Sequence, residues 1–201
     1  MDAPTALVLI DLQNSYFELP GLAPYRDVLV TRVNELLRAA RQGHRPVIAV
    51  HTEHAHDRST WTLNMLADDQ GFAFPGTRQA DLLSDLELPA DLLRVAKTRD
   101  DAFFGTTLAD RLAELEVQSI VLCGVSTHSC VAQTAIAAFA RNLTCAVARA
   151  AVASEDGELS AALLAFLHRE LRQQLLDRGS ALRVLRGDGD RVLADRSGGA
   201  L

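Results

Sequence analysis

Three side chains that could build a nucleophilic site stand far apart in the chain, at Asp11, Lys97 and Cys130. Asp11 lies at the end of an apolar run, where a buried carboxylate needs either a partner or a chemical role. Lys97 follows another short apolar run, and pairing would hold both charges in one cleft. Cys130 follows a turn near the start of a helical pattern, where free N–H groups and the helix dipole favour a thiolate. The competing interpretations are a helix-capping aspartate and a solvated surface lysine.

The other cysteines and the nearest histidine are less suited to this chemistry. Cys123 and Cys145 lie within apolar runs, which is typical of small buried side chains. Three cysteines do not make a disulfide framework. His128 stands two residues before Cys130 on a tight turn, from which its ring is badly placed to reach the sulfur. We expect it to line the pocket or touch the substrate.

Neither a metal nor a cofactor is expected. His54 and His56 could supply two metal ligands, but such sites usually need three convergent ones. The residues after Asp11 read Leu-Gln-Asn-Ser-Tyr and lack the glycine-rich turn that cradles a dinucleotide pyrophosphate.

Alternating short apolar runs and helical patterns predict the elements that would position these residues. Strands are expected at 6–12, 46–51, 92–96, 119–124, 143–148 and 181–185, and helices at 27–42, 59–66, 107–115, 129–142 and 157–178. This alternation indicates an α/β fold, a three-layer αβα Rossmann-like sandwich with a six-stranded, mainly parallel sheet. Ligands of such sheets bind beyond the carboxyl ends of the strands, so the distant candidates should converge there.

Length and composition favour one globular domain. The chain has 201 residues, 48% of them apolar and 23% charged, and we expect a domain at 1–186 and a poorly ordered tail at 187–201. A net charge of −6 without a basic stripe argues against nucleic acid. No apolar run approaches the roughly 20 residues that span a membrane. The N-terminus lacks the pattern of a secretory signal, so a cytoplasmic location is expected.

Three segments together resemble the isochorismatase-like cysteine hydrolases. They read ALVLIDLQNSYF, VAKTRDDAFFGTTL and VLCGVSTHSCVAQTAIAAFARN, and the resemblance runs from about residue 5 to 186. It implies that Asp11 is the base, that Lys97 holds the charged pair in place, and that Cys130 is the nucleophile. It also implies a cis peptide between Val125 and Ser126, and an oxyanion hole built from the backbone N–H groups of Ser126 and Cys130.

The resemblance further implies a small-molecule substrate and a homo-oligomer, either a dimer or a tetramer. The superfamily includes nicotinamidases, N-carbamoylsarcosine amidases, and ureidoacrylate and biuret hydrolases. A complete Asp-Lys-Cys set favours cleavage of an amide, ureido or cyclic amide C–N bond through a thioester. The alternatives are vinyl ether hydrolysis, which should survive loss of the cysteine, and a non-catalytic binding protein. The substrate-binding candidates are Gln13, Phe17, Trp61, Phe104 and His128.

Some positions depart from the family pattern or stay open. Nicotinamidases carry an Asp-x-His and a further His that bind metal, whereas this chain has His54-Ala55-His56. Where the family often has Asp-Ala after the fifth strand, this chain has Arg149-Ala150. Arg99 could recognise a substrate carboxylate or form a surface salt bridge.

Overall fold

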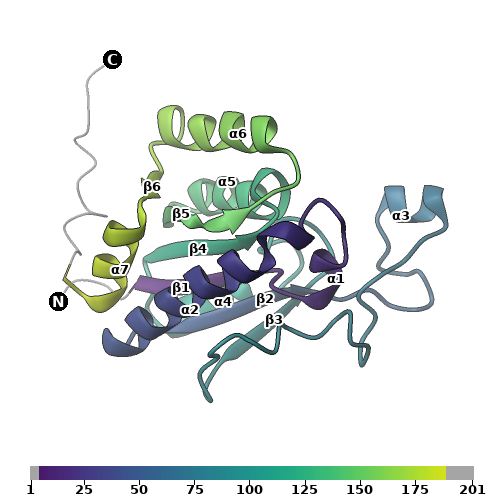
Figure 1. The fold of residues 1–201 in the computed structure, drawn as a ribbon, viewed down its shortest axis with the longest axis horizontal. Coiled ribbons are helices and arrows are strands. Elements are labelled where there is room, and N and C mark those ends of the chain that lie inside the picture. Colours follow the sequence, from purple (N-terminus) through teal and green to yellow (C-terminus); the bar gives the residue numbers. More distant parts are fainter. Residues whose placement is uncertain (1–4, 189–201) are drawn as a thin grey trace.

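Six strands form one parallel sheet at the centre of the molecule (Figure 1). The computed structural model describes residues 5–188. The strands are β1 (Thr5–Ile10), β2 (Val47–Thr52), β3 (Leu93–Lys97), β4 (Ser119–Val125), β5 (Thr144–Ala153) and β6 (Gln174–Leu176). Their spatial order is β3-β2-β1-β4-β5-β6, and every pairing is parallel. The order changes direction at β1, so β1 and its neighbours β2 and β4 frame the point where such sheets bind ligands.

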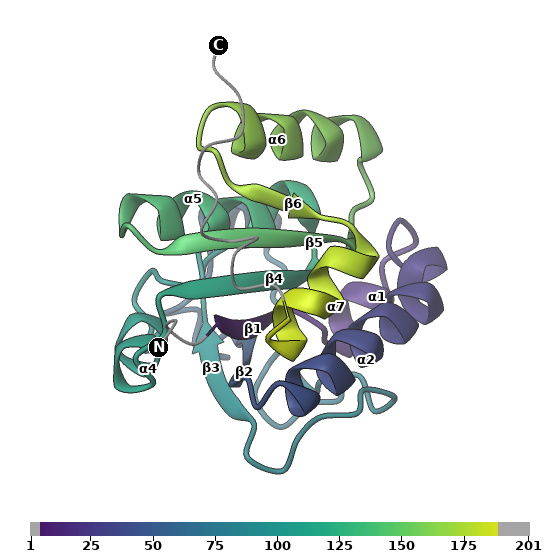
Figure 2. The same cartoon turned by 90° about the vertical axis from the view of Figure 1, so that its left-hand side faces the viewer.

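Helices cover both faces of this sheet. They are α1 (Asn14–Phe17), α2 (Arg26–Gln42), α3 (Leu63–Asp68), α4 (Leu108–Glu114), α5 (Ala132–Ala140), α6 (Gly157–Arg169) and α7 (Arg178–Arg186), with a 3-10 turn at Ala23–Tyr25 and a π-helical turn at Thr127–Val131. Helices α2 and α7 lie on one face and α4, α5 and α6 on the other (Figure 2). The side chains of each group pack into a separate core. The expected three-layer α/β architecture is therefore confirmed.

Strand β1 shows why the centre of the sheet is apolar throughout. All six of its residues are buried. Leu7 and Leu9 point into the core beneath α2 and α7, whereas Ala6, Val8 and Ile10 point into the core beneath α4 and α5. A strand covered on both faces needs apolar side chains at every position, which accounts for the unbroken run in the sequence.

The C-terminal part differs from the expectation. The helix expected at 157–178 ends at Arg169, and the sixth strand is Gln174–Leu176 rather than 181–185. The segment 181–185 belongs to α7, whose N-terminus is capped by the Asp177 carboxylate accepting from Ser180 N–H at 2.7 Å. Gly187 and Asp188 close α7, and the rest of the expected tail lies outside the described residues.

Smaller differences concern element ends and the long connection between β2 and β3. Strand β1 ends at Ile10, β5 continues to Ala153, and the short helix of the connection is Leu63–Asp68 rather than 59–66. The part of the connection that carries α3 extends away from the sheet (Figure 1). Its later part returns to the site, where Leu83 N–H donates to Leu12 O at 2.9 Å.

Candidate active site

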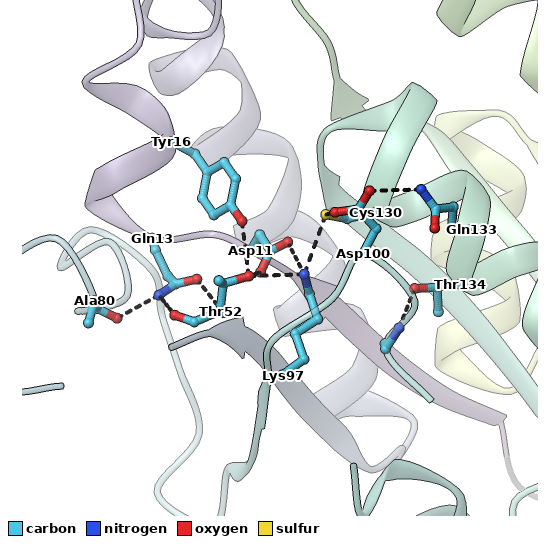
Figure 3. A network of polar contacts seen from close by, with 11 residues as sticks. Asp11, Gln13, Tyr16, Thr52, Ala80, Lys97, Asp100, Cys130, Gln133 and Thr134 are labelled. Carbon is cyan, nitrogen blue, oxygen red and sulfur yellow. Dashed lines mark hydrogen bonds and ion pairs between the residues drawn. The ribbon is translucent and has the colours of Figure 1, made fainter. Parts of the chain in front are cut away.

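The ends of three adjacent strands bring together Asp11, Thr52 and Lys97 (Figure 3). Asp11 follows β1, and Thr52 and Lys97 are the last residues of β2 and β3. The Asp11 N–H still donates to Val50 O at 2.9 Å, but its φ of 51° turns the chain off the sheet. Aspartate tolerates this left-handed conformation better than most residues. The side chains of Asp11 and Lys97 are 0% and 1% exposed, so their charges are held away from water.

A buried ion pair and one hydroxyl organise these groups. Lys97 Nζ lies 2.8 Å from Asp11 Oδ2 and donates to Thr52 Oγ1 at 2.9 Å. Thr52 Oγ1 in turn donates to Asp11 Oδ1 at 2.9 Å. The Tyr16 hydroxyl lies 2.9 Å from the same oxygen, and since the single Thr52 hydrogen is committed to Asp11, Tyr16 must be the donor. Burial, followed by the Asp11 carboxylate, raises the pKa of Tyr16 well above its ordinary value, which keeps that hydrogen in place.

The Lys97 ammonium stays charged in this environment. Burial by itself would lower the pKa of Lys97, but the ion pair with Asp11 and the contact with Cys130 outweigh it. The pKa of Lys97 therefore lies above its ordinary value. A charged lysine paired with a carboxylate avoids the cost of an isolated buried ion.

The Gln13 side chain joins Thr52 to Ala80 through three hydrogen bonds. Its Nε2 donates to Thr52 O at 2.8 Å and to Ala80 O at 2.9 Å, and its Oε1 accepts from Thr52 N–H at 2.7 Å. The side chain is fully buried. Gln13, expected as a substrate contact, thus makes its recorded contacts with β2 and the returning connection.

Cys130 reaches the same place from β4 through a π-helical turn. Ser126 O accepts from the N–H groups of Ser129 and Val131, on either side of Cys130, at 3.2 Å each. Such one-turn π elements occur often at functional sites. The Val125–Ser126 peptide is cis, as the resemblance implied. Just before it, Gly124 has a φ of +123°, and a Cβ there would lie 1.9 Å from Ile10 O, so only glycine fits between β1 and β4.

The Cys130 sulfur faces both an ammonium and a second carboxylate. Lys97 Nζ lies 3.4 Å from Sγ, and Sγ lies 3.6 Å from Asp100 Oδ1. Burial raises the pKa of Cys130 well above its ordinary value, Asp11 and Asp100 add to the rise, and Lys97 opposes it. The free N–H groups and the helix dipole favour a thiolate at this position, whereas burial raises the pKa of the thiol and favours its protonated form. Burial also raises the pKa values of Cys123 and Cys145.

The other expected pocket residues spread out around this centre. Phe17 packs into the core beneath α2, on the opposite face of the sheet from the Cys130 core. Trp61 is buried in the connection, where its Nε1 donates to Ala55 O at 2.9 Å. Phe104 is 62% exposed. His128 lies on the turn itself, with Nδ1 hydrogen-bonded to Ser154 Oγ.

The remaining candidates have partners of other kinds. His54 Nδ1 lies 3.1 Å from Thr60 O, and the His56 ring stacks on Phe74 with centroids 4.2 Å apart. Within residues 5–188, no three His, Cys, Asp or Glu side chains are grouped so as to hold a metal. Arg149 is exposed at a cavity of about 520 Å³ beside α6.

Sequence reasoning missed the residues that link the three expected ones. Thr52 lies at the strand end where ligands are expected, but a threonine carries no signal of its own among the histidines that follow it. Tyr16 and Asp100 stand within quoted motifs but carry no spacing signal of their own. Gln133 Nε2 donates to Asp100 Oδ2 at 2.7 Å, a contact that only the packing of α5 creates. A cavity of about 480 Å³ lies at the far edge of the sheet, where β2 and β3 begin, and not at this enclosed site.

Comparison with known proteins places this geometry in a family. The family model described as the isochorismatase domain matches residues 5–174. The chain belongs to the isochorismatase family. An isochorismatase family protein of Desulfovibrio vulgaris has 26% identity and a TM-score of 0.80, with 96% of this chain and 99% of that chain covered. The N-carbamoylsarcosine amidase of Thermoplasma acidophilum shares the fold at 21% identity and a TM-score of 0.75, covering 87% of this chain and 96% of that one.

One relative of similar sequence is described as inactive. A protein of Arabidopsis thaliana described as a probable inactive nicotinamidase is 29% identical over 145 residues, which are 68% of this chain and 73% of that protein. The family and fold make this chain an isochorismatase-family hydrolase. Among its described helices, none is long and apolar enough to cross a membrane.

Proposed function

We propose that this isochorismatase-family hydrolase cleaves a C–N bond of a small amide, ureido or cyclic amide compound through a thioester on Cys130. One observation carries the proposal, namely that the Lys97 ammonium lies 2.8 Å from Asp11 and 3.4 Å from the Cys130 sulfur. A nucleophile and a base that both contact one orienting charge are the parts that covalent catalysis requires.

The first half-reaction forms the thioester. Because the pKa of Cys130 is raised, its proton is present at rest and must be taken up by a base, which we assign to Asp11. Lys97 stays charged and holds that carboxylate beside the sulfur. Sγ then adds to the carbonyl carbon, and the N–H groups of Ser126 and Cys130 stabilise the oxyanion. Asp11 returns the proton to the departing nitrogen, the C–N bond breaks, and the amine leaves.

The second half-reaction releases the acid. Water attacks the thioester carbonyl as Asp11 takes one of its protons. The same oxyanion contacts form again, the C–S bond breaks, and the proton returns to the sulfur. Every proton in this cycle passes through Asp11, which Thr52 and Lys97 hold in one orientation.

Two alternatives make different demands on Cys130. Vinyl ether hydrolysis would continue without its thiol. A non-catalytic protein, as the description of the Arabidopsis relative suggests for that protein, would not need the thiol at all. The N-carbamoylsarcosine amidase name of a structural neighbour supports the C–N reaction.

The deciding experiment measures ammonia release from a panel of small primary amides and ureido compounds. Wild type is compared with Cys130→Ala, and with Cys145→Ala as a matched control for loss of a buried thiol. We expect turnover by wild type and Cys145→Ala, a loss of about 10³-fold or more in Cys130→Ala, and an acyl adduct on Cys130 in the intact mass. Turnover of an amide or a vinyl ether by Cys130→Ala would contradict the proposal. So would a wild-type Cys130 that gives no turnover and whose alkylation rate by iodoacetamide is unchanged by Asp11→Asn.

A further inference from the structure

A second carboxylate stands beside the nucleophile and has no part in the mechanism above. Asp100 follows β3, and its Oδ1 accepts from Cys130 Sγ at 3.6 Å (Figure 3). Its Oδ2 accepts from Gln133 Nε2 at 2.7 Å, so a residue of α5 fixes the orientation of the carboxylate. Asp100 is half-buried, and the neighbouring Cys130 is itself 3% exposed.

The negative charge of Asp100 is not neutralised by a neighbouring cation. Lys97 is paired with Asp11. Arg99 stands next to Asp100 in the sequence, but its guanidinium donates to the backbone oxygens of Thr60 at 2.7 Å and Thr98 at 2.6 Å. Among residues 5–188, no ion pair joins Asp100 to an Arg, Lys or His. With Cys130 protonated, two carboxylates therefore face one ammonium around the sulfur.

We propose that Asp100, held by Gln133, selects substrates that carry a cationic or N–H-rich group beside the scissile carbonyl. Suitable groups are an ammonium, an amidinium or a free ureido NH₂. The inference rests on the proposed function and adds the substrate class to it. A carbonyl carbon attacked by Sγ places its neighbouring atoms within hydrogen-bond reach of Asp100 Oδ1, because that oxygen lies 3.6 Å from the sulfur.

The hydrogen bonds of Asp100 Oδ1 change when a substrate binds and Cys130 loses its proton. In the resting site Asp100 Oδ1 accepts from the Cys130 thiol at 3.6 Å, and rotation about the Cβ–Sγ bond can turn the thiol hydrogen to Asp11. When Asp11 takes that hydrogen, Oδ1 loses its donor, and a substrate N–H can replace it. An ionised carboxylate only accepts hydrogen bonds, so a substrate carboxylate at the same place would be repelled. The suggestion that Arg99 recognises a substrate carboxylate fits this arrangement poorly, since its guanidinium already donates to backbone carbonyls.

The test uses small methanethiosulfonates that label cysteine and differ in charge. Their 2-aminoethyl, methyl and 2-sulfonatoethyl forms are cationic, neutral and anionic, and each rate at Cys130 is divided by the rate with N-acetylcysteine. Intact mass spectrometry follows the labelling, with Cys130→Ala as the blank. The ratio of interest is the corrected labelling rate with the cationic reagent divided by that with the anionic reagent. We expect this cation-to-anion ratio to be about tenfold or more in the wild type, and to fall about tenfold in Asp100→Asn. Asp110→Asn removes an exposed charge on α4 and should leave the ratio unchanged.

Further variants separate recognition from other roles. Gln133→Leu keeps the charge but frees the carboxylate, so part of the preference should remain. A ratio unchanged in Asp100→Asn would overturn the inference. Equal slowing of all three reagents would also overturn it, because Asp100 would then act on the thiol proton.

The outcomes also separate this inference from the proposed function. If ammonia release depends on Cys130 but the cation-to-anion ratio of labelling rates does not depend on Asp100, only the proposed substrate class is contradicted. Ammonia release by Cys130→Ala would remove the proposed function. A wild-type Cys130 that no reagent labels would contradict both.

Discussion

The Thr52 hydroxyl donates to Asp11 Oδ1 at 2.9 Å, and this contact fixes which oxygen of the carboxylate remains for Lys97. Asp11 Oδ2 is left to the ammonium at 2.8 Å. Because Thr52 Oγ1 also accepts from Lys97 and Tyr16, one small side chain satisfies three buried polar groups. The ion pair thus depends on a neutral neighbour for its geometry.

Replacing Thr52 by valine should weaken both folding and turnover. The change keeps the shape but removes the donor to Asp11 and the acceptor for Lys97 and Tyr16. Each buried polar group left without a partner costs about 1–3 kcal/mol. We therefore expect the free energy of unfolding to fall by an amount in that range or somewhat above it. Urea unfolding would measure it. Thr52→Ser keeps the hydroxyl and should recover most of both properties, and a serine variant as weak as the valine variant would contradict this account.

Replacing one partner of the Asp11–Lys97 ion pair should lower the free energy of unfolding more than replacing both partners. Lys97→Met leaves a buried carboxylate without its cation, for which a loss of about 3–5 kcal/mol is expected. The double variant Asp11→Leu/Lys97→Met leaves no uncompensated charge and should be more stable than Lys97→Met alone. A double-mutant cycle in urea checks this, and additive losses would show that the two charges do not stabilise each other.

Stability should fall at alkaline pH. The pKa values of Cys123, Cys130 and Cys145 are all raised by burial, so the folded chain keeps these protons after the unfolded chain has released them. The unfolded state then binds fewer protons, and the free energy of unfolding decreases as the pH rises above about 8.5, the ordinary pKa of a thiol. The slope approaches about 1.4 kcal/mol per pH unit for each thiol.

The slope at alkaline pH can be assigned by variants. Unfolding free energies from pH 7 to 10 should fall less steeply in Cys123→Ala and Cys145→Ala than in wild type, whatever the cavity costs at pH 7. A slope that neither variant changes would mean that other groups cause the decline.

Chelation should leave the protein unchanged. His54 already makes a hydrogen-bonding contact with Thr60 O, and its pKa is lowered, mainly by burial, so the ring stays neutral. The His56 ring is stacked on Phe74, and within residues 5–188 no third His, Cys, Asp or Glu joins the two histidines in a group that could hold a metal. Dialysis against a chelator should change neither the unfolding midpoint nor ammonia release. Activity lost on chelation, regained with zinc and absent from His54→Ala would show that a metal site does form here.

The sequence was informative wherever one residue type had one plausible environment. The apolar run of β1 with Asp11 at its end, and the cysteine after β4, both located their residues correctly at one edge of the sheet. The sixth strand was misplaced because Ala-Leu-Arg-Val-Leu fits a short strand as well as a helix. The signal against a strand was Asp177, whose carboxylate caps α7.

The contacts around the triad could not be read from the sequence in the same way. The π-helical turn depends on where Ser126 O finds its donors, and Asp100 meets Gln133 only because α5 packs there. These are products of tertiary packing, which leaves no periodic pattern along the chain.

The burial of Cys130 also affects how fast its thiol is oxidised. Cys130 is 3% exposed and burial raises the pKa of its thiol, whereas oxidants attack exposed thiolates fastest. In the folded state the nucleophile is therefore sheltered from peroxide, and its shelter comes from segments near residues 11, 52, 97 and 100, which assemble only when the whole sheet is in place. We therefore expect peroxide to convert Cys130 to the sulfinic or sulfonic acid more slowly in the folded chain than in the unfolded chain.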